Sequence, residues 1–371
     1  MRYYLIAGEA SGDLHGSNLI AALHQQDPHA VMRCWGGDKM QAAGATLVKH
    51  YRELAFMGFA EVIKNLPTIL RNIRSCKKDI ERFDPDVLVC IDYPGFNLRI
   101  AKWAHAKKIR VVYYIAPQVW AWKEDRVRGM KQYIDQLLVI LPFEKDFFAT
   151  RWQWPVSYVG HPLVQVIDQA KQQAPDPPLA DKPIVALLPG SRQQEIAKKL
   201  PVMLRASRSF PDHQFIVAKA PGTPDLFYTE WLAPYPNVQI VSDKTYPLLR
   251  QAKAALVTSG TATLETALFG VPQVVCYKGS WLSYQIGKRL VKVNYISLVN
   301  LIMNKAVVTE LIQDQLTPDN LCRSLSEILS NGDKRQQMQE DYSQLQELLC
   351  SSGQASSTAA ALIVAGLTRS A

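Results

Sequence analysis

The sequence predicts an α/β protein that folds as two doubly wound, mostly parallel sheets. Short apolar runs of strand length alternate with helix-like patterns in both halves of the chain. A polar, proline-rich stretch separates the two halves. The length of 371 residues favours two domains of similar size.

The predicted strands are the apolar runs of each half. In the first half they are 3–7, 87–91, 111–115 and 137–141. In the second half they are 184–188, 214–218, 238–240, 254–257 and 274–276. Several of these runs end in polar or glycine-rich turns, and in an open parallel sheet ligands bind at the carboxyl edge of the strands.

The stretch DQAKQQAPDPPLADKP, residues 168–183, is the predicted linker. We therefore expect a first domain over 1–167 and a second over 184–345. Residues 346–371 form a predicted helical segment, for which a return to the first domain is one expected path.

Composition limits the class of protein. The formal net charge of +9 favours anionic partners, but the chain carries no zinc-finger, RRM or KH motif, so we expect no nucleic acid. Six scattered cysteines without C-x-x-C spacing indicate neither a zinc site nor a disulfide framework. The N-terminus has no signal-peptide pattern and no apolar run approaches membrane-spanning length, so a reducing cytoplasm is expected.

The stretch GEASGDLHG, residues 8–16, joins the first strand to a helix predicted to begin near Leu14. Its Gly-x3-Gly-x3-Gly spacing matches neither the dinucleotide fingerprint nor the phosphate loop, which disfavours an NAD dehydrogenase. Its polar side chains are Glu9, Ser11, Asp13 and His15. By itself such a cluster is also typical of turn and cap chemistry.

Two turns of the second half have the pattern of anion sites. In ALLPGSRQQEI a strand runs through Gly190 and Ser191 into a helix that opens with Arg192, so N–H groups, helix dipole and guanidinium converge. In LVTSGTATLETALFG the same pattern places a helix after Ser259, with Glu265 in its second turn available to a ribose. Ordinary helix caps are the alternative for each turn.

Asp92 follows the strand 87–91 at the ligand edge, in CIDYPGFN, and is a candidate general base. The alternative is that it only caps the next helix. The D-x-D pattern Asp84-Pro85-Asp86 precedes the same strand and so lies at the opposite edge, where we interpret it as a strand-entry turn. We therefore predict no metal site.

Residues 56–78 form an amphipathic pattern in which apolar side chains at helical spacing alternate with basic ones. This pattern suits either a core-facing helix or a surface that docks on an anionic bilayer. The proposed membrane patch consists of Val62, Ile63, Lys64, Leu66, Leu70, Arg71, Ile73 and Arg74.

Eight ordered blocks over nearly the whole chain resemble the lipid-A-disaccharide synthases. The blocks are GEASGDLHG at 8–16, MGFAEV at 57–62, IDYPGFN at 91–97, PQVWAW at 117–122, LPFE at 141–144, GHPL at 160–163, LPGSR at 188–192 and SGTATLE at 259–265. The resemblance implies a GT-B fold, with two Rossmann-like domains facing a cleft. It also implies an inverting transfer that joins UDP-2,3-diacylglucosamine to 2,3-diacylglucosamine 1-phosphate and releases UDP.

The resemblance also implies roles for individual positions. It places UDP against Arg192, Ser259, Gly260, Thr261, Ala262, Thr263, Glu265 and Asn300. It places acceptor chemistry near Glu9, Ser11, Asp13, His15 and Asp92, with Asp92 as general base and His15 or Glu9 as alternatives. Val299 stands where the family often has proline before the asparagine. No cofactor is expected beyond the UDP-sugar donor substrate.

Because the implied substrates carry acyl chains, the docking interpretation of the amphipathic segment is preferred. The protein is then expected in the cytoplasm, peripherally associated with the inner membrane, and a homodimer is left open. A UDP-sugar epimerase of the same fold and a non-catalytic, membrane-surface lipid-binding protein remain alternatives. Product analysis with a single sugar nucleotide would expose the epimerase, and UDP release would exclude the lipid-binding protein.

Overall fold

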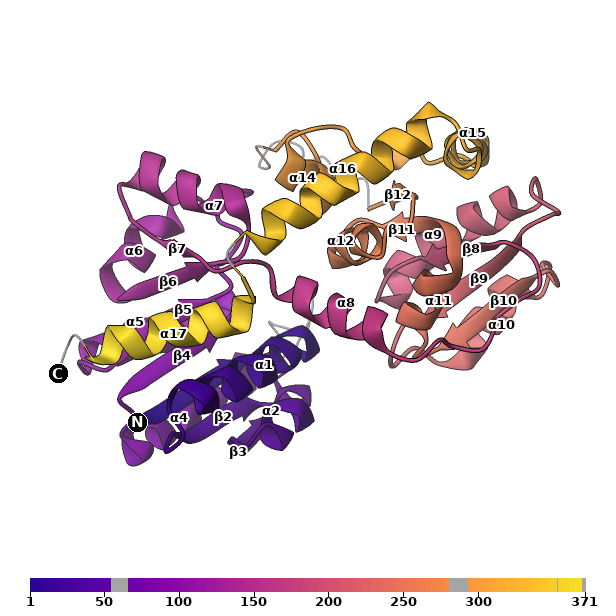
Figure 1. Cartoon of the computed structure of the whole chain (residues 1–371). Coiled ribbons are helices and arrows are strands. Elements are labelled where there is room, and N and C mark those ends of the chain that lie inside the picture. Colours follow the sequence, from indigo (N-terminus) through magenta and orange to yellow (C-terminus); the bar gives the residue numbers. More distant parts are fainter. Residues whose placement is uncertain (55–65, 280–292, 352, 369–371) are drawn as a thin grey trace. The chain divides into compact units, whose positions relative to one another are not determined.

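The computed structural model describes residues 1–54, 66–279, 293–351 and 353–368. They form two compact units (Figure 1). Unit 1 comprises Met1–Pro162 and Leu349–Ala371, and unit 2 comprises Leu163–Leu348. The C-terminal segment therefore belongs to the first unit, and the chain passes between the units twice.

Unit 1 contains a seven-stranded sheet whose strand pairs are all parallel. Its spatial order is β3 (Thr46–His50), β2 (Val31–Gly36), β1 (Arg2–Ala7), β4 (Val87–Ile91), β5 (Arg110–Tyr114), β6 (Gln136–Val139), β7 (Ser157–Tyr158). The order reverses direction between β1 and β4. In doubly wound sheets this switch point is where ligands bind.

Helices cover both faces of this sheet because alternate side chains of each strand point to opposite faces. Tyr4, Ile6 and Tyr113 lie in one apolar cluster, and Tyr3, Leu5 and Tyr114 lie in the other. The first cluster is completed by α4 (Leu66–Phe83), α5 (Pro94–Ala106) and α6 (Arg126–Tyr133). The second is completed by α1 (Ala10–Gln26), α2 (Asp38–Ala42) and α17 (Ala355–Thr368). A short helix, α7 (Pro142–Asp146), follows β6.

Unit 2 repeats the topology with six parallel strands. Their order is β10 (Val238–Ser242), β9 (Gln214–Lys219), β8 (Ile184–Leu188), β11 (Ala252–Thr258), β12 (Gln273–Tyr277), β13 (Thr309–Ile312). The switch point lies between β8 and β11. The helices are α8 (Pro162–Gln172, whose first residue belongs to unit 1), α9 (Gln193–Ser207), α10 (Asp225–Leu232), α11 (Thr245–Gln251), α12 (Thr261–Leu268), α14 (Leu298–Met303), α15 (Pro318–Leu329) and α16 (Asp333–Cys350).

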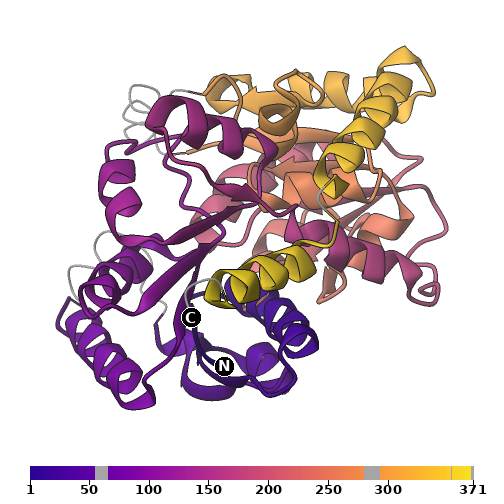
Figure 2. The ribbon, with the colours of Figure 1, turned by 60° about the vertical axis from the view of Figure 1, so that its left-hand side comes forward.

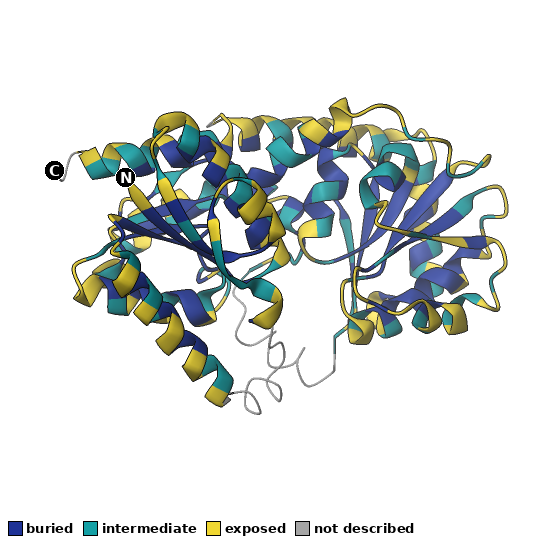
Figure 3. Ribbon diagram, turned by 90° about the horizontal axis from the view of Figure 1, so that it is seen from below, coloured by how far each residue is buried: buried dark blue, intermediate teal, exposed yellow. Residues whose placement is uncertain are grey.

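Two parallel, doubly wound sheets are the predicted fold class, which is confirmed. The sequence analysis did not predict four of the strands: β2, β3, β7 and β13. The predicted linker was placed partly inside a helix, because residues 168–172 belong to α8 and only 173–183 lack helix and strand. Coloured by burial, the strands are mostly buried, whereas many helices carry one buried and one exposed face (Figure 3).

The C-terminal helix α17 runs alongside α1 in both ribbon views (Figure 2). Ala359, Ala360 and Ile363 are fully buried in the core of unit 1. Contrary to the sequence expectation, the described residues include one stretch, Asp333–Thr368, that is long and apolar enough to cross a membrane. The core helix of a soluble protein passes the same test, so this stretch is weak evidence for a membrane span.

Candidate active site

The turn after β1 is shorter than predicted, because α1 begins at Ala10 and Glu9 is its N-cap residue. The glycines of GEASGDLHG allow close packing. A Cβ on Gly8 would lie 2.2 Å from the Tyr93 ring, one on Gly12 would lie 3.1 Å from the Ala7 Cβ, and one on Gly16 would lie 2.7 Å from the Met40 sulfur. The glycines therefore seat α1 and Tyr93 against the ends of the neighbouring elements.

Asp92 directly follows β4, across the switch point from Glu9. Asp92 and Tyr93 both have left-handed backbone, with φ of 45° and 50°. Burial, followed by the nearby charge of Glu9, raises the pKa of the Asp92 carboxyl to about 6, against the opposing hydrogen bond from the Tyr93 backbone. A carboxylate with such a pKa is a stronger proton acceptor than an ordinary aspartate and is still ionised at neutral pH.

His15 is 8% exposed, and its Nδ1 has no hydrogen-bond partner within the described part of the chain. Burial lowers the pKa of its imidazole to about 4. Burial, with a smaller contribution from His15, lowers the pKa of the neighbouring His161 to about 3. Both rings are therefore neutral at pH 7 and are weaker bases than Asp92.

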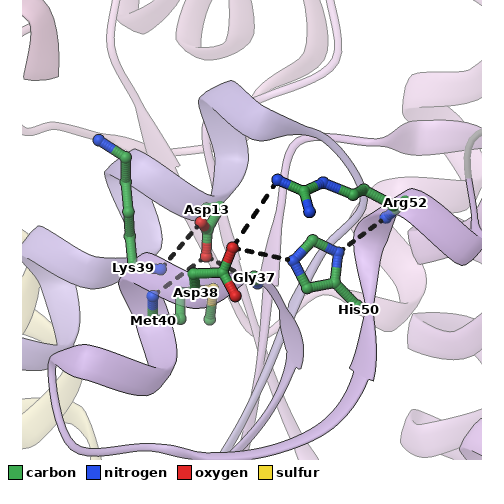
Figure 4. A network of polar contacts seen from close by, with 7 residues as sticks. All are labelled: Asp13, Gly37, Asp38, Lys39, Met40, His50 and Arg52. Carbon is green, nitrogen blue, oxygen red and sulfur yellow. Dashed lines mark hydrogen bonds and ion pairs between the residues drawn. The ribbon is translucent and has the colours of Figure 1, made fainter.

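Asp13 is held by the N-terminus of α2 (Figure 4). Its Oδ1 accepts from the N–H of Gly37 at 2.7 Å and of Met40 at 3.1 Å, and its Oδ2 accepts from the N–H of Lys39 at 3.2 Å. Next to it, Asp38 pairs with His50 and Arg52. Asp13 thus caps the helix α2. Ser11 is exposed near the start of α1. The contacts of both residues with the acceptor stay predictions.

Glu144 is a buried acid that the sequence analysis did not single out. Its carboxylate accepts from the Trp120 Nε1 at 3.0 Å and from the N–H of Leu141 at 2.9 Å and of Ile140 at 3.2 Å. Burial nevertheless raises its pKa to about 7, and the charge of Asp92 adds to that rise. The sequence feature that could have identified Glu144 is its position in the LPFE block, in the first turn of a helix that begins with proline.

In unit 2, Arg192 is the N-cap residue of α9 at the switch point between β8 and β11. Its side chain is 63% exposed and its Nη1 lies 3.6 Å from Glu195 Oε1. The preceding Gly190 has φ of 130°, a backbone conformation that favours glycine. The turn therefore places a guanidinium at the end of a four-turn helix whose dipole favours anions.

The second turn of unit 2 leads into α12. Gly260 has φ of 145°, and its carbonyl accepts from the Thr263 hydroxyl at 2.8 Å. The Ser259 hydroxyl donates to the Ile296 carbonyl at 2.8 Å. Gly260 and Thr261 are exposed and Ala262 is half-buried, so the helix start is accessible to a ligand.

Glu265 and Asn300 each have partners within unit 2. Tyr246 donates its hydroxyl to Glu265 Oε1 at 3.1 Å, and burial raises the pKa of the Glu265 carboxyl. The Asn300 amide donates to the Val308 carbonyl and to Glu310, and its oxygen accepts from the Val308 N–H. The Asn300 side chain is thus tied to β13, and its predicted contact with UDP stays a prediction.

Lys199 is a basic residue that the sequence analysis missed. It is only 3% exposed, donates to the Thr258 hydroxyl at the end of β11, and has its pKa lowered by burial. A Cβ on Gly190 would lie 3.4 Å from its Nζ. A buried ammonium beneath the Gly190 turn adds positive charge to this edge, but no sequence motif marks it.

The structure describes only part of the predicted membrane patch, and one of the described residues is buried rather than exposed. Val62, Ile63, Lys64 and the Leu66 side chain lie outside the described residues. On α4, Leu70 is 43% exposed, and Arg71 and Arg74 are exposed too. Ile73 is 7% exposed and packs in the core of unit 1, so its assignment to a surface patch was wrong.

The D-x-D pattern lies before β4, where Asp86 accepts from the Arg2 N–H at 2.7 Å, as expected of a strand-entry turn. Within the described ranges no group of three or more histidine, cysteine, aspartate or glutamate residues has an arrangement that could hold a metal ion.

Two parallel, doubly wound sheets are the arrangement of the GT-B fold. Solved structures with that fold superimpose on nearly the whole chain. The kitacinnamycin glycosyltransferase has a TM-score of 0.71 at 15% identity over 99% of each chain. A UDP-GlcNAc 2-epimerase from Neisseria meningitidis, bound to UDP-GlcNAc, has a TM-score of 0.68 at 13% identity over 100% of each chain.

The chain belongs to the lipid-A-disaccharide synthetase family, whose sequence model matches residues 3–364. The lipid-A-disaccharide synthase of Syntrophus aciditrophicus (strain SB) is 39% identical over 93% of this chain and 92% of its own. That of Coxiella burnetii (strain Dugway 5J108-111) is 37% identical over 90% of each. The predicted resemblance is confirmed: the chain is a glycosyltransferase enzyme of lipid A biosynthesis.

Proposed function

We propose that this enzyme transfers 2,3-diacylglucosamine from UDP to the 6-hydroxyl of 2,3-diacylglucosamine 1-phosphate with inversion at the anomeric carbon. The acceptor oxygen forms the new bond to that carbon while the bond to the β-phosphate oxygen of UDP breaks. The hydroxyl proton passes to a base, and the bonding electron pair leaves on UDP. Membership of the lipid-A-disaccharide synthetase family supports these substrates.

On the acceptor side, Asp92 takes the proton. The observation that carries this role is the place of its half-buried carboxyl group at the switch point of unit 1, within reach of the charge of Glu9. The raised pKa that follows matches a base that must be ionised before reaction and hold a proton after it. Glu9 supplies the negative charge that strengthens this base.

On the donor side, Arg192 and the N-termini of α9 and α12 receive the diphosphate, and Glu265 receives the ribose. Negative charge on the β-phosphate grows as the glycosidic bond breaks, so a charge-assisted hydrogen bond from the guanidinium strengthens in the transition state. The exposed Arg192 side chain at a helix start fits this task. No step of this scheme uses a metal ion.

The enzyme works in the cytoplasm at the surface of the inner membrane. Leu70, Arg71 and Arg74 on the exposed side of α4 support this proposal, since basic side chains beside an apolar one suit an anionic bilayer. Acylated substrates reside in such a bilayer, so a docked enzyme meets both of them there.

The test is an assay of UDP release with the acylated donor alone, with the acylated acceptor alone, and with both. We expect UDP and a disaccharide 1-phosphate only when both are present, a new glycosidic linkage of the anomeric configuration opposite to the donor's, and the same rate in excess chelator. UDP release or epimerised sugar from the donor alone would contradict the transfer reaction. A strict Mg²⁺ requirement would contradict the assignment of the diphosphate to Arg192 and the helix ends.

A further inference from the structure

The backbone carbonyl of Asp92 accepts hydrogen bonds from two buried side chains. The Tyr113 hydroxyl, on β5, donates to it at 2.6 Å, and the Asn97 Nδ2, on α5, donates to it at 2.8 Å. The same Asn97 Nδ2 also lies 3.2 Å from the Ile91 carbonyl and 3.3 Å from the Ile6 carbonyl. Asn97 therefore ties the ends of β4 and β1 together at the switch point.

These bonds hold a backbone conformation that side-chain-bearing residues rarely adopt. Asp92 and Tyr93 are consecutive residues in the left-handed conformation. Because this conformation costs energy for residues with side chains, it persists only where surrounding contacts hold it in place. Tyr93 completes the arrangement, since its ring covers Gly8 and its hydroxyl donates to the Leu54 carbonyl at 3.0 Å. The turn thereby brings the Asp92 carboxyl close enough to Glu9 to be affected by its charge.

We propose that Asn97 and Tyr113 are positioning residues for the transfer reaction, which fix the Asp92 carbonyl so that the left-handed turn presents the Asp92 carboxylate beside Glu9. This proposal rests on the proposed function, in which Asp92 is the general base. Neither residue touches a substrate in this scheme, so each acts on the rate only through Asp92.

Strand β5 offers a matched control for Tyr113. Its neighbour Tyr114 is also fully buried but faces the opposite side of the sheet, in the cluster with α1 and α17. The Tyr114 hydroxyl has no hydrogen-bond partner among the described residues. Tyr113→Phe and Tyr114→Phe therefore remove the same atom from adjacent buried positions, and only the first removes a hydrogen bond to Asp92.

The experiment is a double-mutant cycle on the full-length enzyme with saturating donor and acceptor. Tyr113→Phe should lower kcat by about tenfold, the upper end of what one lost hydrogen bond supplies, with both KM values unchanged. Tyr114→Phe should leave kcat unchanged. In the Asp92→Asn background Tyr113→Phe should have no further effect, because its route to the rate is already removed. Melting temperature and UDP affinity check that each variant folds.

Asn97→Ala is a second variant, expected to lower kcat in the wild-type background and not in Asp92→Asn. If it fails to fold, the tyrosine pair carries the test alone. A normal kcat for Tyr113→Phe overturns the proposal, as does an equal loss in both Asp92 backgrounds, which would indicate a general structural role. An Asp92→Asn enzyme with wild-type kcat would instead refute the base itself, and the positioning proposal with it.

Discussion

At the scale of single residues, the Asp92 carboxyl predicts the pH dependence of the reaction. Its pKa is raised to about 6, and it accepts a proton only when ionised, so kcat/KM should rise as pH increases through about 6. Glu9→Gln removes the negative charge that raises this pKa and should move the acidic limb to lower pH. Glu144 and Tyr113 also face Asp92, and both stay in place in this variant.

The pH profiles of kcat/KM for the wild type and Glu9→Gln, measured with acceptor well below its KM, check this prediction. Glu53→Gln, on an exposed side chain of the same unit, is the matched control and should leave the limb in place. An acidic limb that Glu9→Gln leaves unchanged, or moves to higher pH, would contradict the electrostatic coupling of Glu9 to Asp92.

The same burial predicts that Asp92 lowers the stability of the fold. Its carboxyl titrates near 6 when folded against an ordinary value of 3.8, so the folded state favours the protonated form. Above pH 6 the ionised form costs on the order of 2–3 kcal/mol, and below pH 3.8 the cost is absent. Asp92→Asn should therefore raise the free energy of unfolding at pH 8 and lose this gain as pH falls towards 4.

Denaturant unfolding of the wild type and Asp92→Asn at pH 8 and at pH 4 measures that difference. A variant that is less stable than the wild type at pH 8 would show that the carboxylate stabilises the turn, and would argue against a strained catalytic group.

Arg192 should act mainly in the transition state. Arg192→Ala should lower kcat by roughly 10²–10³, the loss typical for one preorganised donor at a developing charge. Arg205→Ala removes an exposed arginine from the last turn of the same helix and should keep normal kinetics. Steady-state kinetics in donor concentration provide the check: a variant with normal kcat and only a raised donor KM would limit Arg192 to ground-state binding.

At the scale of elements, a single turn of α4 contains both a surface position, Leu70, and a core position, Ile73. Ile73→Ser should destabilise unit 1 by about 2–5 kcal/mol, because it removes a buried side chain from the core. Leu70→Ser should leave the melting temperature nearly unchanged.

Arg71→Glu/Arg74→Glu should weaken binding to phosphatidylglycerol vesicles by more than tenfold, since each basic side chain contributes about 1 kcal/mol near an anionic surface.

Vesicle sedimentation and thermal melting of these variants distinguish the two kinds of position. Vesicle binding that survives the charge reversal would exclude this part of α4 from the docking surface. A melting temperature lowered equally by Leu70→Ser and Ile73→Ser would place both side chains in the core.

Much of the element structure could be predicted from the sequence, for reasons visible in particular strands. β4 and β8 are buried on both faces and so consist of uninterrupted apolar residues, and both have the predicted bounds. β3 is half-buried at the sheet edge and mixes lysine and histidine with apolar residues, while β7 has only two residues. Neither strand contains an apolar run long enough to distinguish it from a loop in the sequence.

The candidate site could be predicted only in part. Asp92 directly follows one apolar strand and Arg192 lies in the turn after another, so the sequence places both at the ligand edge. Tyr113, Glu144 and Lys199 look like ordinary strand or helix residues, and only their partners give them a role: the Asp92 carbonyl, the Trp120 indole and the Thr258 hydroxyl. Such contacts join residues 20 to 60 positions apart and leave no local pattern.

At the scale of the whole molecule, the proposed reaction divides its tasks between the two units. In that proposal unit 1 supplies the base, and unit 2 supplies the groups for UDP. A change to the base should therefore affect the chemical step and leave donor binding intact, because Asp92 and the donor groups belong to separately packed sheets.

The most direct test of this account is the kinetics of Asp92→Asn with both acylated substrates at saturation, together with its affinity for UDP. The account predicts a kcat lower by roughly 10²–10⁴, the usual contribution of a general base, with UDP affinity and folding preserved. A variant whose kcat at saturation equals that of the wild type, with only the acceptor KM raised, would contradict the account and leave Asp92 as a residue that binds the acceptor.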